Sequence, residues 1–157
     1  MHSARLGRVT DWLTDDEQRA WRGLLHMTAQ LNGRLARQLQ DEHEISLADY
    51  EVLVRLYEAP DAEGLRARDL EASLSWEQSR LSHQLTRMQR RGLVERGDCP
   101  ADRRGATFAI TPAGRAAIEH AAPGHVAAVR RLFFDHLAPE DVARLDELTA
   151  RIIGRLS

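Results

Sequence analysis

Apolar residues recur at helical spacing toward both ends of the chain. From Trp21 to Leu39 they continue up to the polar segment "DEHE", so the pattern predicts one long amphipathic helix. Thr14, three residues before Glu17, has the pattern of a capping box and places the helix start there. A second apolar stripe follows Pro139 near the C-terminus, at Val142, Leu145, Leu148, Ile152, Ile153 and Leu156. Two long amphipathic helices therefore flank the middle of the chain.

The segment after the first helix predicts two shorter helices. Ser46 can cap a helix that ends before Pro60 and the loop "APDAEG". A short third helix is expected next, with leucines on one face at positions 65, 70 and 74.

A fourth helix is expected after Ser75, because "SWEQ" has the pattern of a second capping box. Gly92 is suited to its C-terminal end. Its apolar positions are Leu81, Leu85 and Met88. Its opposite face carries hydroxyls, an imidazole and guanidiniums, at Ser79, Ser82, His83, Thr86, Arg87 and Arg90. Such groups are typical of helices that contact base edges and phosphates.

Two short strands are expected after this helix. "GLVERGD" and "GATFAIT" flank the polar loop that begins at Cys99, which predicts a β-hairpin. Thr111 and Pro112 can then start another helix, which Pro123 should bend or break. The expected fold class is mainly α with a small β-hairpin.

Positive charge is concentrated in the middle of the chain. The net charge is −2, yet seven arginines and four acids between Ser75 and Gly105 give that segment +3. All 22 basic residues are arginine, a side chain that can make bidentate contacts to phosphate and guanine. The overall balance argues against a general nucleic-acid coat, and the local excess favours specific binding by the middle segment.

The order helix, turn, polar-faced helix and hairpin is that of a winged helix-turn-helix. In that architecture the fourth helix enters the major groove and the hairpin reaches the adjacent minor groove. Arg104 is the candidate for insertion into a narrow minor groove, with Asp102 pairing to Arg103 or Arg104 to hold its direction. Gly105 would let the turn close.

The stretch "SRLSHQLTRMQRRGLVERGDCPADRRGATFAITPAGR" resembles the MarR (multiple antibiotic resistance) transcriptional regulators. It contains the family's recognition-helix pattern, Gly-Leu-Val-x-Arg strand and Asp-x-Arg wing, with Ile110 where the family usually has leucine before a threonine. The resemblance implies a homodimer that binds a pseudo-palindromic operator in double-stranded DNA. It also implies DNA contacts from the fourth helix and from the wing, at Ser79, Arg80, Ser82, His83, Arg87, Asp102, Arg103 and Arg104.

Residues 1–157 are accordingly expected to form a single MarR-like domain. The dimerisation helices are expected at the N-terminal residues 14–42 and the C-terminal residues 112–157. The winged helix-turn-helix DNA-binding lobe is expected at residues 46–111. Ala138 stands where a capping serine or threonine is common, so the last helix is expected to start less firmly.

The resemblance further implies a repressor that a small ligand releases from DNA. Relatives commonly hold anionic aromatic or lipophilic compounds between the dimer helices and the DNA-binding lobe. The residues expected there are Trp21, His26, Tyr50 and Arg55.

The sequence is also compatible with two other classes of function. A helical adaptor that binds proteins would explain the end helices but would give the hairpin arginines no purpose. A redox-responsive regulator could act through Cys99. This cysteine is flanked by Asp98 and Asp102 and lacks basic neighbours that would reliably stabilise a thiolate, although Arg96 and Arg103 are near in sequence. No phosphate loop, hydrolase motif or close histidine pairing is present, so neither an enzyme, a cofactor nor a metal site is expected. No stretch is apolar enough to span a membrane, and a cytoplasmic protein without membrane contact is expected.

Overall fold

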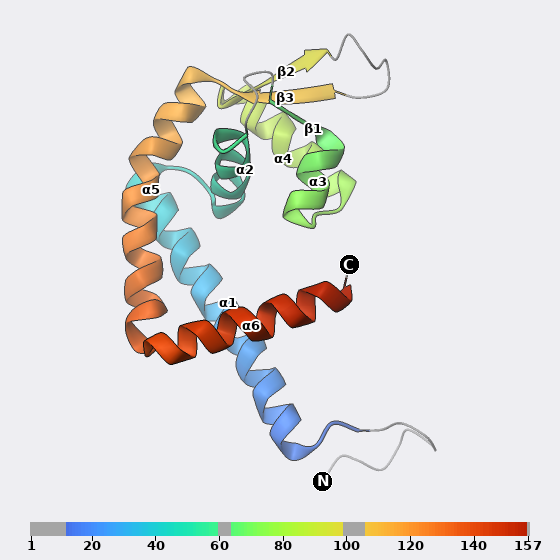
Figure 1. The fold of residues 1–157 in the computed structure, drawn as a ribbon. Helices are drawn as coiled ribbons and strands as arrows, with labels where there is room; N and C mark the ends of the chain where they lie inside the picture. Colours follow the sequence, from blue (N-terminus) through green and yellow to red (C-terminus); the bar gives the residue numbers. More distant parts are fainter. Residues whose placement is uncertain (1–11, 60–63, 99–105, 157) are drawn as a thin grey trace.

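The computed structural model describes residues 12–59, 64–98 and 106–156 (Figure 1). The described part is mainly helical and carries one small sheet, which confirms the expected fold class. Its helices are α1 (Asp15–His43), α2 (Leu47–Tyr57), α3 (Ala67–Leu74), α4 (Gln78–Arg90), α5 (Pro112–Leu132), the 3-10 helix η1 (Phe134–His136) and α6 (Pro139–Leu156). Its strands are β1 (Leu65–Arg66), β2 (Val94–Asp98) and β3 (Ala106–Ile110).

Local capping chemistry sets several helix starts where the sequence predicted them. The Thr14 hydroxyl accepts a hydrogen bond from the Glu17 amide at 3.2 Å, and the Glu17 carboxylate accepts one from the Thr14 amide at 2.7 Å. Ser46 caps α2, and Thr111 caps α5 with Pro112 at its first position. Each side chain satisfies amide groups that a helix start leaves without a partner.

The start of α4 differs from the prediction. Ser75 ends α3 in a left-handed conformation, with φ 53°, and Glu77 is the N-cap of α4 without a side-chain capping bond. The expected capping box from Ser75 is therefore wrong, because that residue is used to close the preceding helix. Gly92 follows α4 with φ 70°, which confirms its expected place.

The sheet has one strand more than the predicted hairpin. The strand order is β1-β3-β2, and both pairings are antiparallel. Leu65 lies in β1 and pairs with Phe108 of β3, so the expected place of Leu65 in the third helix is wrong. A Cβ at Gly64, which has φ 84°, would lie 2.0 Å from the Phe108 carbonyl oxygen, so only glycine allows this approach.

The main core lies between α2, α3, α4, the sheet and the start of α5. Its buried apolar residues are Val52, Leu53, Leu56, Leu70, Leu81, Leu85, Met88, Leu93, Val94, Phe108 and Ile118. Burying each large side chain contributes roughly 1.5–3 kcal/mol. A smaller cluster of Leu39, Ile45 and Ala121 joins the end of α1 to α5. The core thus fixes α4 against the sheet and leaves the opposite face of α4 outside.

α5 is one helix that continues past Pro123, and Figure 1 shows its axis curving, so of the two expected outcomes the helix bends and does not break. Ala121 and Ala128 are buried on either side of the proline, and their packing holds the segment helical. The start of α6 is also better fixed than expected, because the Asp141 carboxylate accepts a hydrogen bond from the Ala138 amide at 3.0 Å.

Candidate nucleic-acid interface

The two faces of α4 differ in the way the sequence predicted. Leu81, Gln84, Leu85 and Met88 are buried against the core. All the predicted outward residues are exposed: Ser79, Arg80, Ser82, His83, Thr86, Arg87 and Arg90. The helix has no acid in its first turn and two arginines in its last. Its outer face therefore offers hydroxyl, imidazole and guanidinium donors without a competing carboxylate.

Two of the outward arginines are held by neighbouring side chains. The Arg80 guanidinium lies over the Trp76 ring, 3.9 Å from the ring centre. Arg87 donates a hydrogen bond to the Gln84 side-chain oxygen. Because such contacts already restrict the rotamers of a long side chain, less conformational entropy is lost when that side chain binds.

Sequence reasoning missed a buried polar network behind α4. Asp49, at the start of α2, accepts hydrogen bonds from Gln84 and from Arg91, each at 2.6 Å. Arg91 also donates to the Glu44 carbonyl oxygen at 2.9 Å. The available signal was Gln84, a polar residue at the helical spacing of Leu81, Leu85 and Met88. The network ties α4 to the junction between α1 and α2.

The β2–β3 hairpin extends away from the core beside α4 (Figure 1). Asp98 of β2 pairs with Ala106 of β3, so the two strand ends that residues 99–105 connect are adjacent. Asp102, Arg103, Arg104 and Cys99 lie outside the described residues, and their expected roles stay predictions.

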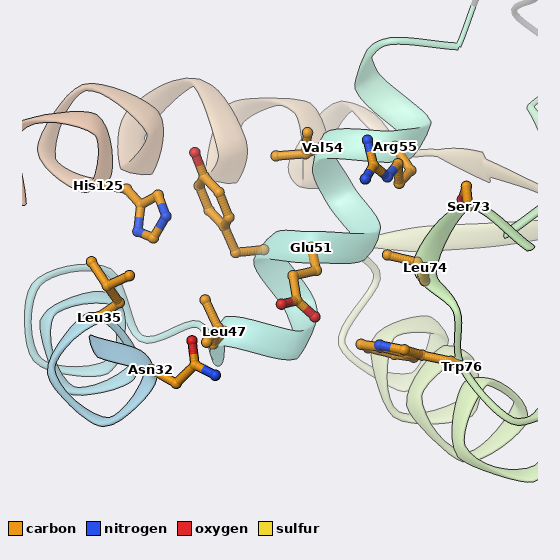
Figure 2. Close-up of a pocket in the computed structure, with 11 residues that line it drawn as sticks. Asn32, Leu35, Leu47, Glu51, Val54, Arg55, Ser73, Leu74, Trp76 and His125 are labelled. Atoms are coloured by element: carbon orange, nitrogen blue, oxygen red, sulfur yellow. The ribbon is translucent and has the colours of Figure 1, made fainter. Parts of the chain in front are cut away.

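A cavity of about 360 Å³ lies between α1, α2, the α3–α4 turn and α5 (Figure 2). Tyr50 and Arg55, two of the four residues named for a ligand site, line this cavity, and their role toward a ligand stays a prediction. Trp21 and His26 do not, because α1 rises about 1.5 Å per residue and meets the cavity further along, at Asn32 and Leu35. The other lining residues are Leu47, Glu51, Val54, Ser73, Leu74, Trp76 and His125.

Burial changes the acid–base properties of the cavity wall. Desolvation raises the pKa of Glu51 above its ordinary 4.5, and the nearby Arg80 and Arg55 guanidiniums oppose this shift. Burial also raises the pKa of Tyr50, with a further contribution from Glu58, and lowers that of His125. Figure 2 shows the Glu51 side chain among the lining residues, so a carboxyl group with a raised pKa forms part of the cavity wall.

The part of the chain that the structure describes has neither a metal-binding cluster nor a membrane-spanning helix. No group of three or more His, Cys, Asp or Glu side chains is placed to hold a metal ion there. Among the same residues, no helix combines the length and apolar character needed to cross a membrane.

Comparison with known proteins agrees with this arrangement. The MarR family model matches residues 43–105. AbsC, a MarR family transcriptional regulator from Streptomyces coelicolor, is 43% identical and has a TM-score of 0.88, and the match covers 94% of this chain and 98% of AbsC. Sco3205, a MarR family regulator from the same organism solved in complex with DNA, is 38% identical with a TM-score of 0.88, covering 93% of this chain and 94% of that one.

CouR from Rhodococcus jostii RHA1, solved with p-coumaroyl-CoA, is 26% identical with a TM-score of 0.74, covering 91% of this chain and 95% of CouR. A search of curated proteins gives no match. The similarity to AbsC and Sco3205 extends over nearly the whole of each chain. The chain therefore belongs to the MarR family of winged-helix, DNA-binding transcriptional regulators.

Proposed function

We propose that the chain acts as a homodimeric, sequence-specific repressor that a small ligand releases from its operator. The observation that carries DNA recognition is the outer face of α4, on which every predicted contact residue is exposed beside a projecting hairpin. In this proposal Ser79, Arg80, Ser82, His83 and Arg87 contact the major groove, and the wing residues Asp102, Arg103 and Arg104 contact the minor groove. The DNA-binding lobe is residues 46–111.

The apolar surface of the end helices supports a dimer. None of the described residues of α6 is buried, and Leu156 is 80% exposed. Trp21 is 53% exposed on α1. Other exposed apolar side chains of these regions are Trp12, Leu13, Leu24, Leu25, Met27, Val142, Ile152 and Ile153. A soluble monomer rarely leaves so much apolar surface on two long helices, and a second copy would cover it. Residues 14–42 and 112–157 are the proposed dimerisation helices.

A dimer would present two copies of α4 to the same side of a duplex. Two half-sites about 34 Å apart, one helical turn of DNA, would then bind with a combined affinity that one lobe cannot reach. This geometry favours a pseudo-palindromic operator. The site of action would be the cytoplasm, where the operator is accessible.

The cavity supports release by a ligand. Its volume of about 360 Å³ is in the range of small-molecule sites, and Arg55 on its wall can pair with an anionic group. The wall residue Trp76 also contacts Arg80 of α4, so an occupant at Trp76 acts next to a proposed DNA contact. CouR was solved with p-coumaroyl-CoA, an anionic aromatic compound, which supports that ligand class for this chain. Only a ligand with different affinities for the two dimer shapes can shift the equilibrium.

Selection of bound duplexes from a random DNA library tests the proposal. We expect enrichment of a two-fold symmetric sequence, and sedimentation should give two chains per duplex. DNA from upstream of the protein's own gene is the natural second probe. A monomer in sedimentation, or a library that shows no enriched sequence at low salt, would contradict the proposal.

A further inference from the structure

We infer that Asp49 is a positioning residue for DNA recognition, which holds α4 at two points from the start of α2. This inference rests on the proposed function, because it concerns the orientation of the recognition helix on DNA. Asp49 is only 2% exposed. The Asp49 carboxylate also accepts a hydrogen bond from the Ser46 amide at 2.8 Å, as part of the capping box of α2. Glu17 makes the corresponding bond at α1 while exposed, so capping alone does not require a buried carboxylate.

The first attachment lies in the middle of α4. The Gln84 amide group donates to one Asp49 oxygen at 2.6 Å, and Gln84 is also 2% exposed. Its neighbours on that face are apolar, so loss of the carboxylate would leave a buried donor unpaired. The Gln84 oxygen accepts from Arg87, which connects Asp49 to the outer face of the helix.

The second attachment lies at the end of α4. Arg91 donates to the other Asp49 oxygen at 2.6 Å and to the Glu44 carbonyl oxygen at 2.9 Å. Gln84 and Arg91 are seven residues apart, which is two turns or about 10 Å along the helix. The apolar core already holds α4 against the sheet through Leu81, Leu85 and Met88, and two polar contacts at this separation restrain its tilt and rotation further than one would. Base-edge hydrogen bonds require donor–acceptor distances of about 3 Å. They therefore depend on both the tilt and the rotation of the recognition helix.

The turn that carries Asp49 is also a wall of the cavity. Leu47, Tyr50 and Glu51 line the cavity from the same turn of α2. Asp49 points instead to α4, through its bonds to Gln84 and Arg91. A compound that shifts this turn would move the anchor of the recognition helix. Asp49 thus lies between the proposed ligand site and the proposed DNA contacts.

The test compares Asp49→Asn and Arg91→Met with Arg90→Met in the full-length protein. Each variant is titrated with the selected operator duplex and with a scrambled duplex over a range of salt concentrations. We expect Asp49→Asn and Arg91→Met to lower the operator-to-scrambled affinity ratio at least tenfold and to leave the salt slope unchanged. Arg90 lies on the outer face, so Arg90→Met should reduce the salt slope and lower both affinities together.

Partial unfolding would lower the affinities for the operator and the scrambled duplex by the same factor and leave their ratio unchanged. If Asp49→Asn and Arg91→Met are folded and their operator-to-scrambled ratio equals that of the wild type, the positioning role is overturned. A salt slope reduced by about one in Arg91→Met would show a direct phosphate contact and overturn it as well. If Asp49→Asn fails to fold, Arg91→Met carries the test, because its side chain is 44% exposed. A wild-type protein that does not distinguish the two duplexes would instead overturn the proposed function.

Discussion

The Arg80 guanidinium lies over the Trp76 ring, with 3.9 Å between the guanidinium carbon and the ring centre. Trp76 lines the cavity, and Arg80 is on the exposed face of α4. Burial raises the pKa of Glu51 on the same cavity wall, and the charge of the Arg80 guanidinium opposes that shift. One proposed DNA contact is therefore in direct contact with the proposed ligand site.

Arg80→Ala should weaken operator binding by about 1–3 kcal/mol and reduce the salt slope by about one, because one guanidinium leaves the duplex. Salt titration with labelled duplex measures both quantities. Arg19→Ala is the control, because Arg19 is exposed at the start of α1 and pairs with Asp16. Equal effects of the two substitutions would contradict the placement of α4 on DNA.

Ser82→Ala and His83→Ala should change which operator sequences are preferred. Both side chains are exposed in the middle of α4, where a recognition helix is closest to base edges. Repeating the duplex selection with each variant gives the preference directly. An unaltered consensus sequence for both variants would count against base contact by this part of the helix.

Arg104→Ala should weaken binding by about 1–3 kcal/mol, with a salt slope lower by about one, if the hairpin tip enters the minor groove. Arg104 lies outside the described residues, so the prediction rests on the sequence pattern and on the hairpin that carries the loop. The loss should be largest for operators with A·T-rich flanks, whose minor groove is narrow. Unchanged affinity on such operators would contradict the wing assignment.

Gly114→Ala should destabilise the fold by at least about 2 kcal/mol, since an added Cβ would lie 2.0 Å from the Leu93 carbonyl oxygen and force the backbone to move. Gly92→Ala is the matched comparison, because its φ is 70° but the added Cβ would have no atom within 4 Å beyond its immediate chain neighbours. That change should cost about 1–2 kcal/mol, for the left-handed backbone alone. Urea unfolding of both variants measures the difference, and a smaller loss at Gly114 would contradict this account.

His125→Phe should make the free energy of unfolding less sensitive to acid. Burial lowers the pKa of His125 from 6.5, so the folded state binds its proton less readily than the unfolded state. The contribution of the neutral His125 ring to the free energy of unfolding is therefore fully present above about pH 7. It is lost as the pH falls below 6.5 toward the folded-state pKa. Phenylalanine removes this titration and keeps a ring against Tyr50, whose centre lies 4.2 Å away. If urea unfolding gives the same pH profile for the wild type and His125→Phe, the lowered pKa of His125 is contradicted.

Short-range signals predicted most of the fold. Thr14, Ser46 and Thr111 cap helices with bonds to amides three residues away, so local sequence determines them. The polar and apolar faces of α4 were predicted in the same way. Long-range contacts were not predictable: β1 exists because Leu65 pairs with Phe108, and Ser75 is taken up by the end of α3.

The candidate site shows the same division. The exposed residues of α4 follow from helical periodicity, whereas the buried bond from Gln84 to Asp49 joins residues 35 positions apart. Of the four residues expected around a ligand, Tyr50 and Arg55 line the cavity, whereas Trp21 and His26 lie nearer the start of α1 and do not line it. A family resemblance indicates the region of a site without its exact wall.

Mapping the bases that the protein protects on its selected duplex tests the central claim most directly. Methylation protection at guanine N7 reports major-groove contact, and hydroxyl-radical cleavage reports minor-groove contact. The account predicts two symmetric major-groove regions centred about 34 Å apart, with minor-groove protection beside each, at two chains per duplex. Protection confined to one region, or none at any salt concentration, would contradict recognition by paired α4 helices and their wings.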